Sequence, residues 1–269
     1  MNETTVVSAD GTPLAARCSG RGSPLVLVHG ALGDLNTFAP LEAPLAEHHT
    51  VWVYSRRNRG GSGDGPSYSI EREAEDVLAV VDAAGGDVHL FGHSAGGAYA
   101  MLAAQQASRL RSVLLYEAAL RTDRMERVTR ERMEAALADG DAAGAIEAFV
   151  PAAGITAEEL AAIRSLEPVW EALQAGVPVF PRELRALQQA SSLLSRIGLP
   201  DVPLLWLHGE LTESVAYPTA SEIAARFPRA ELHRLSGQRH LAPMFDPATF
   251  AQVMLAFTAR VDRDLSAAG

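Results

Sequence analysis

The stretch that most constrains this chain runs from Val88 to Gly97 and has the sequence VHLFGHSAGG. Its first four residues are expected to form a short buried strand, and the small apolar run Ala98–Ala104 is expected to form a helix. Between them, Gly-x-Ser94-x-Gly predicts a sharp turn that holds the serine hydroxyl at the carboxyl end of the strand, beside the unpaired N–H groups of the helix. The same pattern also fits a glycine-rich turn whose serine only caps the helix. The rest of the sequence is needed to distinguish a reactive serine from a structural one.

Buried strands and helices alternate on both sides of this turn. Extended patterns occur at Thr4–Ser8, Ala15–Cys18, Leu25–Val28, Val51–Tyr54 and Val113–Tyr116, and helical patterns at Asn36–Ala46 and Ile70–Ala84. The Asp10-Gly11 dipeptide between the first two strands predicts a hairpin. The alternation predicts an α/β fold with a mostly parallel central sheet flanked by helices.

A long segment after the sixth expected strand breaks this alternation. Between Arg121 and Gly198 the sequence predicts helices at Arg121–Ala138, Ala142–Phe149, Ala157–Ser165 and Pro181–Ser195. The α/β pattern then resumes with strands at Pro203–Leu207 and Glu231–Leu235 and helices at Thr219–Phe227 and Pro247–Phe257. We therefore expect a core of residues 1–118 and 202–269 and an inserted helical cap of residues 119–201.

Composition excludes several kinds of partner. The chain has 269 residues, of which 48% are hydrophobic, and its net charge of −10 argues against a nucleic-acid surface. No apolar run approaches the roughly 18 residues that a membrane helix needs, and no export leader is visible. Cys18 is the only cysteine, so an internal disulfide is excluded and the cytoplasm is the expected location. The sequence does not indicate an oligomeric state.

If Ser94 is a nucleophile, it needs a base to take the proton of its hydroxyl, and histidine is the usual choice. The chain has eight histidines. His240 lies just after the last expected strand, and the carboxyl ends of parallel strands open on one edge of the sheet, where sites form. His240 is therefore the expected partner of Ser94, and His208, at the end of another strand, is its only rival.

The order of these features resembles the α/β-hydrolase superfamily. His29-Gly30 follows one strand, Gly-His-Ser94-Ala-Gly follows another, and a helical insertion and a late Gly-x-x-His240 come after them. The loop after Tyr54 is similar to that of a bacterial subgroup of small serine hydrolases, except that Ser55 stands where the subgroup usually has Asp, and Asn58 where it has Gly. The resemblance covers essentially the whole chain.

This resemblance implies a role for several residues. Ser94 would be the nucleophile, with His240 as its general base and later general acid. The backbone N–H groups of Ala31 and Ala95 would form the oxyanion hole. The candidate substrate-binding residues are His29, His93, Leu32 and Trp170.

The acid of the triad has two candidates. Most α/β-hydrolases carry Asp a few residues after the strand that ends near Leu207, but Thr212 occupies that position here, and Glu213 follows one residue late. Glu117 stands at the end of the strand after the turn's helix, the other place used in the superfamily. A carboxylate at a buried strand end needs a cationic partner, so Glu117 is favoured and Glu213 is the alternative.

The expected function is hydrolysis of a small to medium, fairly apolar ester or related carbonyl compound through a Ser-His-acid triad and an acyl-enzyme. No metal-ligand spacing, phosphate loop or dinucleotide fingerprint is present, so neither a metal nor an organic cofactor is expected. The alternative is a member of the fold that does not hydrolyse: a cofactor-free lyase or cyclase, or a ligand-binding protein without turnover.

Overall fold

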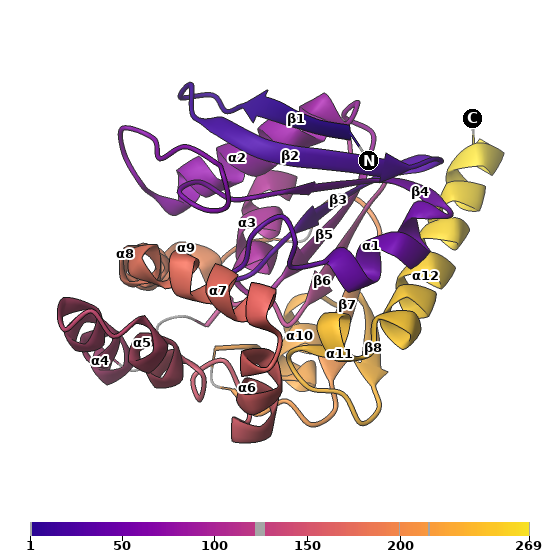
Figure 1. The fold of residues 1–269 in the computed structure, drawn as a ribbon. Coiled ribbons are helices and arrows are strands. Elements are labelled where there is room, and N and C mark those ends of the chain that lie inside the picture. Colours follow the sequence, from indigo (N-terminus) through magenta and orange to yellow (C-terminus); the bar gives the residue numbers. More distant parts are fainter. Residues whose placement is uncertain (1, 122–126, 199, 215, 269) are drawn as a thin grey trace.

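An eight-stranded sheet forms the centre of the molecule (Figure 1). The computed structural model describes residues 2–121, 127–198, 200–214 and 216–268. The sheet order is β1-β2-β4-β3-β5-β6-β7-β8. The strands span β1 (Asn2–Val7), β2 (Pro13–Gly20), β3 (Ser23–Val28), β4 (His49–Tyr54), β5 (His89–His93), β6 (Ser112–Tyr116), β7 (Leu204–Gly209) and β8 (Glu231–Leu235).

The pairing of the strands confirms the predicted fold class. β1, β2 and β4 pair antiparallel, so the Asp10-Gly11 hairpin forms as predicted, and every pair from β4 to β8 is parallel. The parallel strands β3 to β7 are mostly buried, whereas the edge strand β8 is mostly exposed, and side chains alternate between the two faces of the sheet. Val26 and Val28 pack on one face, for example, and Leu25 and Leu27 on the other.

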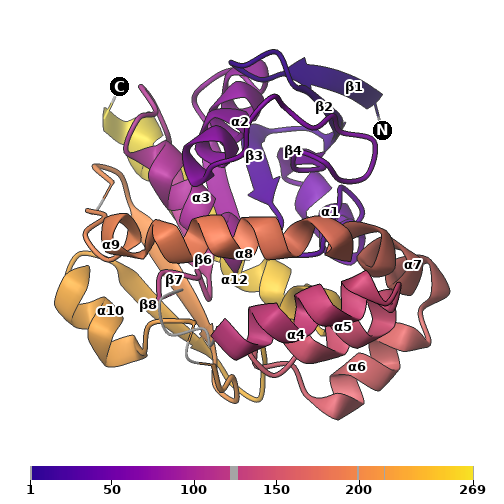
Figure 2. The ribbon, with the colours of Figure 1, turned by 90° about the vertical axis from the view of Figure 1, so that its left-hand side faces the viewer.

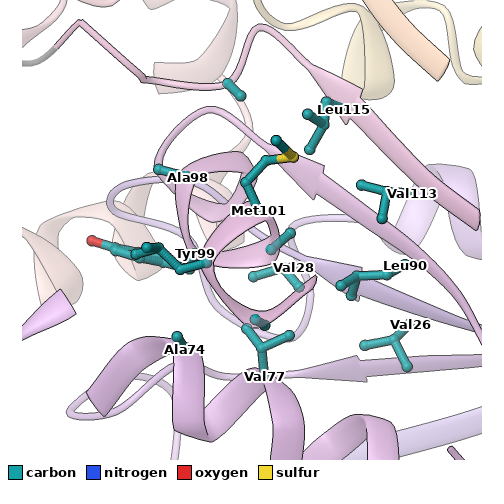
Figure 3. Packing of buried hydrophobic residues seen from close by; sticks show 14 of the residues in the cluster. Val26, Val28, Ala74, Val77, Leu90, Ala98, Tyr99, Met101, Val113 and Leu115 are labelled. Atoms are coloured by element: carbon teal, nitrogen blue, oxygen red, sulfur yellow. The ribbon is translucent and has the colours of Figure 1, made fainter. Parts of the chain in front are cut away.

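Helices cover both faces. On the face of Val26 lie α2 (Ile70–Ala83), α3 (Ala95–Ala104) and α10 (Ala220–Arg226), and Figure 3 shows Ala74, Val77, Ala98 and Met101 packed against the strand side chains. On the other face lie α1 (Ala39–Ala46) and the long α12 (Pro247–Ala268). A short helix, α11 (Ala242–Phe245), precedes α12. No helix in the described ranges is both long and apolar enough to cross a membrane.

The segment between β6 and β7 is helical where the structure describes it. It contains α4 (Arg127–Ala138), α5 (Ala142–Phe149), α6 (Ala157–Arg164), α7 (Glu167–Gly176), the 3-10 turn η2 (Val177–Val179), α8 (Phe180–Gln189) and α9 (Ser191–Leu194). We call α4–α9 the inserted helices. Figure 1 and Figure 2 show them together on one side of the molecule, and α8 crosses in front of the sheet in Figure 2. The exact limits of a cap at residues 119 and 201 stay a prediction.

Two helix boundaries differ from the sequence prediction because of proline. The pattern predicts a first helix from Asn36, but α1 begins at Ala39, with Pro40 in its first turn, where the missing N–H costs nothing. The sequence pattern predicts no helix between Ser165 and Pro181, where α7 lies. Pro168 lies in the first turn of α7 and begins that helix.

Candidate active site

Ser94 lies at the turn between β5 and α3 in a strained conformation. Its φ is 56°, in the left-handed region that few non-glycine residues adopt. A Cβ at Gly92 would lie 2.6 Å from the Cα of Gly97, and one at Gly96 would collide with the carbonyl oxygens of Val28 and His29. The glycines are therefore required by close backbone approach, and the serine is held at the sheet edge.

Glu117 and His240 form a short hydrogen bond next to this turn. The Nδ1 atom of His240 lies 2.6 Å from Oε2 of Glu117, and both side chains are buried. The backbone N–H of Gly209 donates to the other carboxylate oxygen at 2.9 Å. Because the carboxylate accepts from Nδ1–H, the lone pair of His240 is on Nε2. Glu117 has a φ of 45°, so this strand end is strained as well.

Glu213, the other candidate, is exposed on the loop after β7. Of the two, Glu117 is the one that hydrogen-bonds His240. His208, the rival base, has its Nδ1 3.6 Å from Glu117, beyond hydrogen-bond distance, and lines a separate small cavity with Trp206.

Tyr217 is the residue that the sequence analysis missed. Its hydroxyl lies 2.9 Å from Nε2 of His240 and 3.5 Å from Oγ of Ser94, and the carbonyl oxygen of Ala153 is a second, more distant acceptor at 3.3 Å. Its ring stacks on the imidazole with centroids 4.7 Å apart. Burial raises the pKa of the phenol, and the Glu117 carboxylate raises it further, so the hydroxyl keeps its proton. The phenol thus bridges the serine and the histidine.

The predicted oxyanion donors flank Ser94. Ala95 is the first residue of α3, so its N–H has no acceptor within the helix. Ala31 lies on the loop after β3, where Gly30 packs so closely that a Cβ on it would be 3.0 Å from Cβ of Ser94. Both alanines lie in the walls of small hollows that also include Ser94.

The structure separates the four candidate substrate-binding residues into two pairs. Leu32 and His93 line the cavity above Ser94. His93 is buried, donates from Nε2 to the carbonyl of His240 at 3.1 Å, and has its pKa lowered by burial and by His240. His93 therefore also helps to hold the loop that carries His240.

The other two candidates, His29 and Trp170, lie away from the cavity. His29 is buried behind the loop, where its Nε2 accepts from the backbone N–H of Arg56 at 3.1 Å, because the loop folds over the imidazole. The Trp170 ring instead carries the Arg164 guanidinium over its face, with 5.0 Å to the centroid. Neither side chain lines the cavity described next.

The cavity above Ser94 has a volume of about 520 Å³ and a mostly apolar wall. The inserted helices contribute Ile146, Phe149, Val150, Ile163, Val169 and Leu173, and the core contributes Leu32, Leu241, Met244 and Phe245. Ser94 and His240 stand in the same wall. Among the described residues that line it, Asp34 is the only Asp, Glu, Lys or Arg. In the same described ranges, no three His, Cys, Asp or Glu residues are grouped to hold a metal ion.

The whole chain was compared with protein families, curated proteins and solved structures. The family model described as "Alpha/beta hydrolase family" matches residues 25–253. A curated relative from Azorhizobium caulinodans, named "Putative carbamate hydrolase RutD", is 28% identical, with 91% of this chain and 94% of the relative covered. The crystal structure of an alpha/beta hydrolase from Sphaerobacter thermophilus is 34% identical over 94% of this chain and 99% of that one, with a TM-score of 0.79. The esterase RhEst1 from a Rhodococcus species, 24% identical over 97% of this chain and all of that one, shares the fold with a TM-score of 0.73.

Proposed function

This chain belongs to the alpha/beta hydrolase family, and we propose that it is a serine esterase for medium-sized, uncharged, apolar esters. The observation that carries the proposal is the hydrogen-bonded series from Glu117 through His240 and Tyr217 to Ser94, in the wall of an apolar cavity. A nucleophile, a base and a group that orients the base are the parts that acyl transfer requires.

The proposed reaction has two steps. Ser94 attacks the ester carbonyl, and the negative charge on the carbonyl oxygen is stabilised by the N–H groups of Ala31 and Ala95. His240, protonated in that step, gives a proton to the leaving alkoxide, and the acyl-enzyme forms. Water then attacks the acyl-enzyme with His240 as base, which releases the acid and restores Ser94. Glu117 holds the imidazole by Nδ1 and balances its charge while it is protonated.

In this proposal, the hydroxyl of Tyr217 relays the proton from Ser94 to His240. As Oγ of Ser94 bonds to the carbonyl, its proton passes to the Tyr217 oxygen while the phenol's own proton passes to Nε2 of His240, so no phenolate forms. Tyr217→Phe keeps the stacked ring and removes only the hydroxyl. We expect kcat for p-nitrophenyl butyrate to fall by about 10²-fold, the range of one acid–base contribution, with KM within about twofold. Unchanged or higher kcat in stopped-flow or steady-state assays would show that the phenol does not transfer the serine proton and instead obstructs Ser94.

The cavity wall supports an uncharged acyl chain as the substrate group. Burial of each methylene contributes about 0.8 kcal/mol, so kcat/KM is expected to rise up to roughly fourfold per carbon from p-nitrophenyl acetate to hexanoate. The matched ester with a terminal carboxylate, p-nitrophenyl hydrogen adipate, is expected to be at least about tenfold poorer than the hexanoate, because no lysine or arginine is among the described lining residues. A preference for the adipate, or rates independent of chain length, would contradict this substrate class. A carbamate ester belongs in the same panel, since the curated relative is named for that group.

A further inference from the structure

A buried charged cluster lies directly behind the Ala31 loop. Arg56 follows β4 and is wholly buried, with its guanidinium 2.8 Å from Glu73 of α2 and 2.7 Å from Glu183 of α8. It lies over the ring of Tyr99 of α3, 4.9 Å from the centroid. One cation with so many fixed partners has a single orientation, since any movement would leave a buried charge unpaired.

Arg56 also holds the peptide that carries a proposed oxyanion donor. Its Nη2 donates to the carbonyl oxygen of Gly30 at 3.1 Å, and Nδ1 of His29 donates to the same oxygen at 2.9 Å. His29 can do so because its Nε2 accepts from the Arg56 backbone N–H, which leaves the ring proton on Nδ1. Gly30 C=O and Ala31 N–H belong to one planar peptide, and no cis bond occurs in the described ranges. Fixing the carbonyl on one side therefore fixes the N–H on the other.

Glu183 brings the inserted helices into this arrangement. It lies on α8, is 1% exposed, and accepts hydrogen bonds from Arg59 and, at 2.8 Å, from the hydroxyl of Tyr99. Figure 3 shows that hydroxyl at the end of a side chain that leaves the apolar cluster. Although burial opposes it, Arg56 and Arg59 keep the pKa of Glu183 below its ordinary value, so the cluster pairs two cations with the carboxylates. Glu73 belongs to the core, whereas Glu183 leaves with α8 if the inserted helices lift.

We propose that Arg56 is a positioning residue for the Ala31 N–H. Through Glu183, the geometry of the oxyanion hole then depends on whether α8 is packed against the core. With α8 seated, Arg56 is held between Glu73 and Glu183 and points at Gly30. With α8 displaced, the guanidinium loses one carboxylate, so that the Arg56 donor to Gly30 is no longer fixed and the His29 Nδ1 donor remains. The apolar cavity and the oxyanion hole are thus completed by the same movement, so that catalysis is coupled to closure over the substrate. This inference rests on the proposed serine esterase function.

The neighbouring ion pair supplies a matched control. Arg57 is also wholly buried and donates to both carboxylate oxygens of Asp76 at 2.7 Å, and it has a second carboxylate, Asp10, at 3.1 Å. Removing the charge of Asp76 leaves Arg57 with one carboxylate, Asp10, as removing that of Glu183 leaves Arg56 with one, Glu73. Glu183→Gln in addition removes the carboxylate that pairs with Arg59. In contrast to Arg56, the Arg57 side chain donates to Asp10, Ser67, Arg72 and Asp76 and, within the described residues, to no group of the Gly30 loop.

The test compares Glu183→Gln with Asp76→Asn in the full chain. Ester hydrolysis gives kcat and KM, and a trifluoromethyl ketone, which Ser94 would convert to a hemiketal oxyanion, reports on the hole itself. For Glu183→Gln we expect kcat to fall and the inhibition constant of the ketone to rise by the same factor, about 10- to 100-fold, with KM within about twofold. Asp76→Asn is expected to lower the melting temperature but to keep kcat and the inhibition constant within about threefold.

The outcomes separate the two proposals. Equal effects of Glu183→Gln and Asp76→Asn would overturn the coupling while leaving a Ser94-dependent esterase intact. Ester turnover that survives in Ser94→Ala would instead overturn the proposed function and the coupling with it. If Glu183→Gln does not fold, Arg56→Lys is measured in its place. It keeps the positive charge between Glu73 and Glu183 but loses the planar fork that reaches Gly30, and the same parallel loss is expected.

Discussion

Replacing Glu117 with glutamine is expected to lower kcat for p-nitrophenyl butyrate by about 10⁴-fold while changing KM little. Glutamine has nearly the same shape, but its amide can donate to Nδ1 of His240 and so stabilise the tautomer that carries the proton on Nε2. That tautomer cannot accept a proton from Ser94. The buried imidazolium formed during attack would also lose its counter-charge, which lies 2.6 Å away in the native protein. Steady-state kinetics, with circular dichroism to show that the variant is folded, measures both effects.

The control for this prediction is Glu213→Gln. Glu213 is an exposed carboxylate on the loop after β7, so its replacement is expected to leave kcat within about twofold of the native value. If Glu213→Gln loses turnover while Glu117→Gln keeps it, the acid has been assigned to the wrong strand end.

The sequence predicted the parts of the site that depend on local backbone. The turn around Ser94 follows from glycines whose side chains would collide with adjacent backbone, and such collisions are encoded within a few residues. The position of His240 follows from topology alone, because all parallel strands end on one edge of the sheet. Glu117 was accessible by the same reasoning, combined with the cost of burying a carboxylate without a cation.

The parts that were missed depend on contacts between distant segments. Tyr217 lies on a loop that offers no periodicity, and nothing near it in sequence indicates that its hydroxyl reaches His240. The contacts of Arg56 could not be predicted for the same reason, since its partners Glu73 and Glu183 are on α2 and α8. The sequence does contain a partial indication of this cluster. Three arginines within four residues, 56–59, in a loop between a buried strand and a helix required carboxylate partners somewhere in the fold.

The positions of His29 and Trp170 away from the cavity have a common cause. Sequence reasoning assigned both to the substrate because they are near the site in chain order or lie in the inserted segment. Whether a side chain faces a cavity or the back of its own loop is decided by packing, which the residue type does not reveal. Leu32, also assigned to the substrate, does line the cavity.

The central claim is that Ser94 is an activated nucleophile. Ser94→Ala keeps the backbone of the turn and removes only the attacking oxygen, so kcat is expected to fall by about 10⁴- to 10⁶-fold, to the rate that the remaining groups support. A folded Ser94→Ala protein that keeps more than a few per cent of native turnover would place the chemistry elsewhere in the molecule.

Labelling with a fluorophosphonate tests this claim most directly, because the reagent reacts with activated serines and leaves a covalent adduct of defined mass. We expect one adduct per native chain, located by peptide mass spectrometry on Ser94, with labelling abolished in Ser94→Ala and strongly slowed in Glu117→Gln. Native protein that remains unlabelled, or Ser94→Ala that labels as fast as the native chain, would show that Ser94 is not an activated nucleophile.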